Sequence, residues 1–249
     1  MLTRRHFIAT SGALFSAPLG QSAFAQAGRP PSELDIIAPT PEPEPAPAPQ
    51  PARQPAPRPP VSDPAMWDRW DARVTPQNYD PSTSNPWGFH PRFLPQIVDA
   101  NDGLRAGDIH VDAVARYLYH IRPDGSAMRY GVAIARGNLY EPGTYSIRRK
   151  AKWPTWRPTD AMIERDPDSF ERFKDGMDGG PSNPLGSRAL YLYVGNRDTY
   201  LRIHGTPSPR SIGGRASSGC VRMVMAHIIG LYDQVDVGAN AYLYPAESI

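Results

Sequence analysis

The chain has 249 residues, and its 27 Lys and Arg against 25 Asp and Glu give a formal net charge of +2. This near balance, with few basic clusters, argues against nucleic acid as a partner. A single cysteine excludes a scaffold of intrachain disulfides, while 30 prolines indicate that part of the chain builds no core.

The N-terminus has the pattern of an export signal over residues 1–27. Arg4 and Arg5 precede a short apolar stretch that is too short and too broken to cross a membrane. The arginine pair indicates the twin-arginine route, with cleavage after Ala25 or Ala27. We therefore expect a periplasmic protein with no transmembrane anchor once the signal is removed.

Composition divides the remainder of the chain into three parts. Residues 28–65 hold about half of the prolines, which predicts a disordered linker that is either a spacer or an inert leader. Residues 66–105 begin with a possible short helix at 66–73 and otherwise predict an extension that wraps over the surface. Residues 106–246 are long enough for one folded domain.

Short strands separated by turns predict that this domain is mainly β, an antiparallel sandwich or barrel with one or two short helices. Hairpins are expected around turns at 123–126 and 195–198. Helical periodicity favours 160–174 and 226–235. The expected strands are 111–121, 128–134, 143–148, 189–194, 199–204 and 240–244.

Cys220 and His204 are the candidate chemical pair. Cys220 lies sixteen positions after the histidine, in a loop that begins with Gly205 and contains Gly219 just before the thiol. A thiolate nucleophile needs a base, donors for an oxyanion, and access. His204 can be the base, the N–H groups of Gly219 and Cys220 can be the donors, and Arg222 adds positive potential or binds a carboxylate.

Other interpretations of the same residues remain open. A lone cysteine is often a small buried side chain, Ser217 or Ser218 could be the nucleophile, and His227 is a rival base because it begins the predicted helix near Cys220. One cysteine and one histidine are too few for a metal site, so no metal is expected.

The period of two along strand 199–204 places Tyr200, Arg202 and His204 on one face. Beside the basic cluster 148–152, Trp153 belongs to an aromatic segment that is either a lid over a cleft or a packed loop with solvated charges. The residue chemistry alone indicates an exported cysteine acyl-transfer enzyme or hydrolase.

Several linked motifs, in order, closely resemble the L,D-transpeptidase (YkuD-type) catalytic domain, from about residue 106 to 245. They are Asn183-Pro184-Leu185-Gly186, Ala189-Leu190-Tyr191-Leu192, Arg202-Ile203-His204-Gly205-Thr206, Ile212-Gly213 and Ser217-Ser218-Gly219-Cys220-Val221-Arg222. The resemblance implies a mostly β fold and a transferase that acts on peptidoglycan. Many relatives have a histidine where this chain has Ser218, which leaves that polar contact open.

By this likeness, Cys220 captures the third-residue carbonyl of a stem tetrapeptide, D-alanine leaves, and an amine resolves the thioester. His204 would be the base, the Gly205 carbonyl would orient it, and Gly219 with Cys220 would hold the oxyanion. No cofactor is implied. The expected substrate contacts are Arg222, Ser217, Ser218, Tyr200, Arg202 and Trp153.

The acceptor amine implied by the resemblance belongs to a second stem peptide or to an envelope protein. Two alternatives use the same fold. One is a hydrolase, either an L,D-carboxypeptidase or an enzyme that releases wall-linked protein. The other is a non-catalytic module that binds the wall.

Overall fold

Strands dominate residues 64–246, the part of the chain that the computed structural model describes. The expected export signal and most of the expected proline-rich linker lie outside this part. The larger sheet has nine strands in the order β1 (Gln96–Asp99), β4 (Ser126–Gly131), β3 (Tyr117–Ile121), β2 (Ile109–Asp112), β11 (Asn240–Leu243), β6 (Gly143–Lys152), β7 (Arg188–Val194), β8 (Arg197–Thr206) and β10 (Val221–Val224).

This sheet is mixed. The β1–β4 and β6–β8 groups are antiparallel, and β11 joins them by pairing parallel to β2 and antiparallel to β6. At the far edge β10 pairs parallel to β8, and a small second sheet pairs β5 (Ile134–Ala135) parallel to β9 (Arg215–Ser217). The mainly β class is confirmed, but the expected antiparallel arrangement is corrected by these three parallel pairings.

Two predicted elements are divided in the structure. The predicted strand 111–121 contains a turn between β2 and β3, because the Asp112 carboxylate accepts the N–H groups of Val114 and Ala115 at 2.8 Å. The predicted helix 160–174 becomes α2 (Asp160–Arg165), α3 (Pro167–Phe170) and the 3₁₀ turn η3 (Glu171–Phe173). Pro167 starts the second helix, and Asp166 caps it by accepting the Ser169 N–H.

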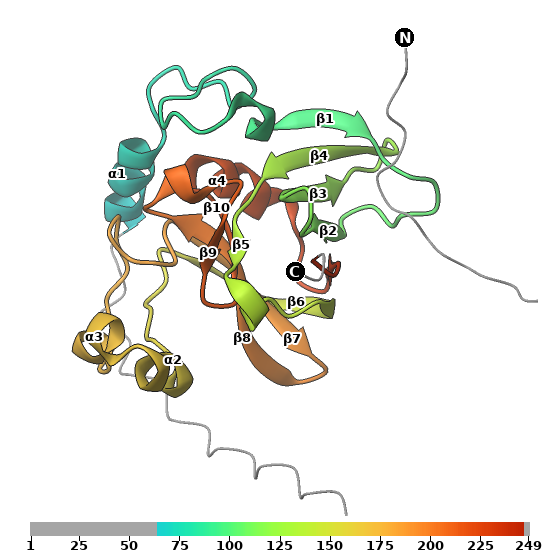
Figure 1. The fold of residues 1–249 in the computed structure, drawn as a ribbon. Helices are drawn as coiled ribbons and strands as arrows, with labels where there is room; N and C mark the ends of the chain where they lie inside the picture. The colour runs from blue at the N-terminus through green and yellow to red at the C-terminus, as the bar shows by residue number, and fades with distance from the viewer. Residues whose placement is uncertain (1–63, 247–249) are drawn as a thin grey trace, which may run out of the picture. The chain divides into compact units, whose positions relative to one another are not determined.

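The main core is organised around α4 (Met225–Gln234), which follows β10 directly. Ile228 and Leu231 on this helix are fully buried. The same apolar cluster takes side chains from β2, β3 and β4 and also from β7 and β8. Strands from both halves of the sheet therefore enclose one core with α4, and Figure 1 shows the helix between them.

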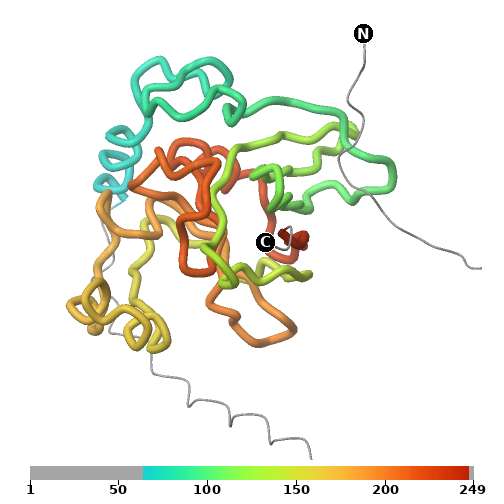
Figure 2. Tube along the Cα trace, in the orientation of Figure 1, coloured from blue at the N-terminus to red at the C-terminus, as the bar shows by residue number. Residues whose placement is uncertain are grey.

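Residues before β2 cross the outside of the domain, from α1 (Pro64–Val74) through η1 (Pro91–Phe93) to β1, as the trace in Figure 2 shows. Phe93 fixes this segment because it packs against two glycines. A Cβ at Gly131 would lie 2.3 Å from the Phe93 Cβ, and one at Gly213 would lie 2.2 Å from its ring. Only glycine therefore leaves room for Phe93 at both positions. The remaining 3₁₀ turns are η2 (Gly137–Leu139) and η4 (Pro209–Ser211).

Candidate active site

The parallel pairing of β8 with β10 brings His204 and Cys220 to neighbouring strands. In this register Ile203 faces Val221 and His204 faces Arg222. Register partners share a face of the sheet, and so does Cys220, two residues before Arg222. Ile203 and Val221 point instead into the main core. His204, Arg222 and Cys220 thus lie on the same side of these strands, opposite that core.

The imidazole of His204 is held in one tautomer. Its Nδ1 lies 2.5 Å from the carbonyl oxygen of Gly205. Because a carbonyl only accepts, Nδ1 carries the hydrogen and Nε2 keeps its lone pair. The side chain is buried, with 3% of the residue exposed. This is the form in which an imidazole can take a proton from a thiol.

The turn 183–186 packs against the backbone of Gly205, whose carbonyl orients His204. Asn183 is fully buried, and its Oδ1 accepts the Leu185 N–H at 2.8 Å. Gly186 has a φ of +61°, and a Cβ there would lie 2.7 Å from the Gly205 carbonyl carbon. The two glycines let the turn approach the backbone that orients His204. This structural role was missed, although the motif 183–186 is visible in the sequence.

The resting pair is neutral. Burial, and then the Arg222 cation, lower the pKa of His204 to about 3. Burial raises the pKa of the Cys220 thiol, and the Arg202 and Arg222 cations only partly oppose that rise. The thiol and the imidazole on this face are therefore both neutral at rest, so the proton has to move as the sulfur attacks. The resting state is therefore not a thiolate–imidazolium ion pair between Cys220 and His204.

Ser217 braces the loop that carries the thiol. Its hydroxyl donates to the Cys220 carbonyl at 2.5 Å and accepts the Gly219 N–H at 3.4 Å. Ser217 is 2% exposed, so the structure places it as a support inside the loop and not on a surface open to substrate. Gly219 has a φ of +145°, which favours glycine, while Ser218 is half-buried beside it.

The two arginines near the sulfur differ in how far their donors are used. The guanidinium of Arg202 makes two bonds to the Asp198 carboxylate, at 2.7 and 2.9 Å, and is buried. The structure thus commits Arg202 to an internal ion pair. Arg222 is half-buried, and its buried Nε has no hydrogen-bond partner among the described residues. Arg222 is accordingly the one with capacity for a bound anion.

Tyr200 forms the exposed rim of the site. The residue is 61% exposed and has a φ of +62°. The Asp198 carboxylate accepts its N–H at 2.8 Å, and its carbonyl lies 3.8 Å from the Cys220 sulfur. Cys220 itself is half-buried, so part of this residue is open to solvent.

Trp153, expected to contact substrate, is placed inside the fold. It is 4% exposed, packs edge-to-face on Trp70 at 5.2 Å, and donates from Nε1 to Asp71 at 3.0 Å. Asp71 also binds the buried Arg188 guanidinium of β7. Trp153 is thus an anchor for α1 and not an exposed lid. Asp71 and Arg188 were missed, because no local pattern links residues 117 positions apart.

His227, the rival base, lies in an aromatic cluster. Its Nε2 is 2.5 Å from the Tyr79 hydroxyl, and its ring stacks on Tyr79 and contacts Trp87 and Phe89. Its Nδ1 is buried without a partner. These contacts occupy His227 with the packing of the segment before β1, which leaves His204 as the candidate base.

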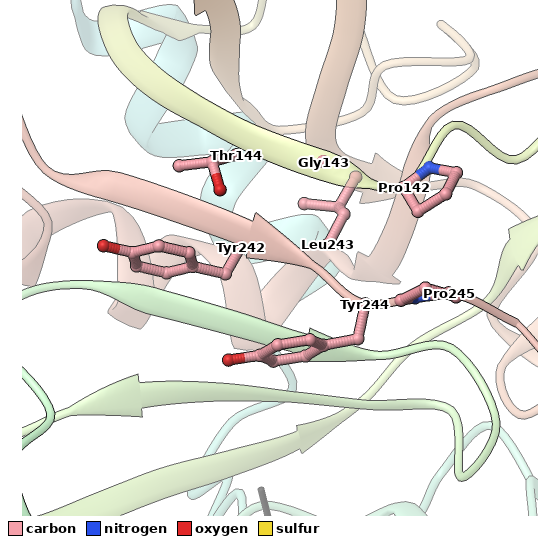
Figure 3. Close-up of a pocket in the computed structure, with 7 residues that line it drawn as sticks. All are labelled: Pro142, Gly143, Thr144, Tyr242, Leu243, Tyr244 and Pro245. Carbon is pink, nitrogen blue, oxygen red and sulfur yellow. The ribbon is translucent and has the colours of Figure 1, made fainter. Parts of the chain in front are cut away.

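A pocket of about 360 Å³ opens between the start of β6 and the end of β11 (Figure 3). It is lined by Pro142–Thr144 and Tyr242–Pro245, which include none of the predicted site residues. Within residues 64–246, no group of three or more His, Cys, Asp or Glu side chains is arranged to hold a metal ion.

The comparison with protein families matches the domain just described. The family model described as YkuD, L,D-transpeptidase catalytic domain, covers residues 106–243, more than half of the chain. The chain belongs to the L,D-transpeptidase family. The matched segment of this L,D-transpeptidase domain runs from just before β2 to the end of β11 and includes both His204 and Cys220.

Curated relatives carry the same family name. The putative L,D-transpeptidase in ATP synthase subunits region ORF 5 of Fuscovulum blasticum is 34% identical over 57% of this chain and 71% of its own length. The probable L,D-transpeptidase ErfK/SrfK of Escherichia coli (strain K12) is 29% identical over 60% of this chain and 47% of its own length. The L,D-transpeptidase match thus spans about half of the E. coli relative.

The solved structure of a probable carnitine operon oxidoreductase from Brucella melitensis is 48% identical, over 62% of this chain and 96% of that one. Its TM-score of 0.44 supports no conclusion about shape. The assignment to the L,D-transpeptidase family rests on the matched domain.

Proposed function

We propose that this chain is an exported L,D-transpeptidase that uses Cys220 as nucleophile and His204 as general base on peptidoglycan stem peptides. The observation that carries the proposal is the shared face of β8 and β10. There the thiol lies one strand away from an imidazole whose Nδ1 is committed to the Gly205 carbonyl. Family membership supports the substrate class.

Acylation begins with both groups neutral. Nε2 of His204 takes the thiol proton as the sulfur forms a bond to the third-residue carbonyl carbon of the donor. The carbonyl oxygen becomes an oxyanion, for which the N–H groups of Gly219 and Cys220 are the proposed donors. Collapse breaks the C–N bond, the imidazolium protonates the leaving amine, and D-alanine departs. A thioester on Cys220 remains.

The second half reverses the roles. An acceptor amine attacks the thioester carbon and gives a proton to the neutral His204. Collapse then breaks the C–S bond, and the imidazolium returns the proton to the thiolate. Gly219 N–H is only weakly engaged by Ser217, at 3.4 Å, so a developing oxyanion can displace that contact. Arg222, with its unpartnered Nε, would meet a carboxylate of the substrate.

The setting of this reaction is part of the proposal. The arginine pair near the N-terminus supports twin-arginine export to the periplasm, where peptidoglycan lies. In residues 64–246, no helix has the length and apolar character needed to cross a membrane. The acceptor is proposed to be a second stem peptide or an envelope protein.

Mass spectrometry of a reaction with disaccharide tetrapeptide tests the proposal. Purified enzyme is expected to release D-alanine and form cross-linked dimers, and a thioester is expected on Cys220. Cys220→Ala should abolish all three signals while its circular dichroism stays unchanged. Tripeptide without dimers would show a hydrolase. Product at the wild-type rate from Cys220→Ala would refute the nucleophile assignment.

A further inference from the structure

A row of four side-chain positions crosses the sheet to the thiol. The β6–β7 register pairs Arg149 with Tyr191, and the β7–β8 register pairs Tyr191 with Arg202. The β8–β10 register continues the row, since Val221 faces Ile203 and the preceding Cys220 therefore lies beside Arg202. Arg149, Tyr191 and Arg202 thus share the sheet face that holds Cys220.

Cation–π contacts connect three members of this row. The guanidinium carbons of Arg149 and Arg202 lie 4.4 and 4.0 Å from the centre of the Tyr191 ring. They come from the two strands that flank the tyrosine, and Tyr191 is 5% exposed. Such cation–π contacts hold a guanidinium by its face and leave its N–H edges free.

Of the basic cluster 148–152, Arg149 is the arginine that keeps those edges open. Arg148 donates to Gly195 and Asn196 at the hairpin tip, and Lys150 donates to the Val235 carbonyl at 2.6 Å. Arg202 is neutralised by Asp198. Arg149 is exposed and forms neither an ion pair nor a hydrogen bond with any described side chain. Its fork of donors suits a carboxylate bound by two hydrogen bonds.

We propose that Arg149 binds a carboxylate of the donor stem peptide and so helps to select the donor. The guanidinium lies over Tyr191, two strands from Cys220, and a spacing of about 4.8 Å per strand puts it about 10 Å from the thiol's strand. A donor captured on Cys220 reaches this point with the carboxylate of its second residue or with the side-chain carboxylate of its third. This inference rests on the proposed function.

Peptide binding to Cys220→Ala tests the contact without turnover. Three tetrapeptides are compared by calorimetry: unmodified, amidated at the second-residue carboxylate, and amidated at the third-residue side chain. Amidation of the carboxylate that Arg149 binds should raise Kd about tenfold, and this rise is the amidation penalty. Amidation of the other carboxylate should leave Kd unchanged, so the comparison identifies which of the two carboxylates Arg149 binds. In Cys220→Ala with Arg149→Met, the unmodified peptide should bind as weakly as the amidated one, and the penalty should vanish.

Two further variants make the result specific. Arg149→Lys keeps the charge but loses the planar fork, so part of the penalty should remain. Arg165→Met removes an equivalent exposed charge from α2 and should leave the full penalty. The contact between Arg149 and the peptide carboxylate is refuted if amidation still raises Kd about tenfold in Arg149→Met. It is also refuted if neither amidation raises Kd in Cys220→Ala. Absence of wild-type turnover, with carboxylate-dependent binding retained, would overturn the proposed reaction instead.

Discussion

At His204, burial and the Arg222 cation act on the imidazole in the same direction, and both disfavour its protonated form. At Cys220, burial outweighs two nearby cations and favours the thiol. The two shifts together keep the proton on sulfur until substrate arrives. A half-buried thiol of this kind is protected from oxidation, because the thiolate is the reactive form.

The pH profile of acylation checks this charge state. Since the pKa of His204 is lowered to about 3, the base stays unprotonated at all pH values well above 3 and is lost only as pH falls through that region. The rate of acylation by tetrapeptide should therefore show no acid limb near pH 6.5. His204→Gln should slow it about 100-fold or more. A limb at pH 6–7, or a mild effect of the substitution, would contradict the assignment.

The brace at Ser217 gives a second test. Ser217→Ala removes the donor to the Cys220 carbonyl, so the free energy of unfolding should fall by about 1 kcal/mol. The acylation rate should fall about tenfold because the loop holds the sulfur less firmly. Ser211→Ala is the matched control, since its hydroxyl also binds a carbonyl but is exposed. Equal effects of the two substitutions, measured by denaturation and kinetics, would dismiss the brace.

Among the elements, α1 is connected to the domain by one carboxylate that has two buried partners. Asp71 binds the Arg188 guanidinium and the Trp153 indole, and Arg188 is only 3% exposed. Loss of Asp71 leaves a buried cation without its partner. The ion pair between Asp71 and Arg188 of β7 therefore contributes to the attachment of α1.

Asp71→Ala should lower the free energy of unfolding by about 3 kcal/mol. Asp68→Ala, an exposed carboxylate on the same helix, should change it by less than about 0.5 kcal/mol. Urea denaturation of both variants makes the comparison. Indistinguishable midpoints would show that α1 does not depend on this pair.

Local sequence pattern predicts some of the elements of this fold and misses others. The hairpin turns after β3 and β7 and the stripe of α4 are predicted correctly, because each depends on neighbours in the chain. The parallel pairing of β8 with β10 was not predicted, because local sequence does not determine which strand pairs with which. The catalytic candidates were found through residue chemistry and motif order, whereas the stack of Arg149 on Tyr191 needs the register of two strands.

At the scale of the whole molecule, four buried histidines give the fold a common response to acid. Burial lowers the pKa of His110, His120, His204 and His227. In the unfolded chain each titrates near 6.5. Below that pH the unfolded chain binds protons that the folded chain excludes, so stability falls as pH falls.

The free energy of unfolding should thus decrease as pH falls below about 6.5, by up to about 1.4 kcal/mol per pH unit for each histidine that stays neutral in the folded chain. His227→Phe preserves an aromatic ring in its cluster and removes one titrating group, so its slope against pH should be shallower than that of wild type. Urea titrations at a series of pH values measure both slopes. Equal slopes for wild type and His227→Phe would show that His227 does not contribute to the pH dependence of stability.

The solitary thiol at the site has a practical use. Cys220 is the one cysteine in 249 residues and is half-buried. An electrophilic fluorophore or spin label will therefore attach to the purified protein at Cys220 alone, and no other cysteine has to be removed by mutation. The speed of labelling as a function of pH would titrate the sulfur directly. Protection by a bound peptide would turn the same reagent into a gauge of occupancy for the purified enzyme.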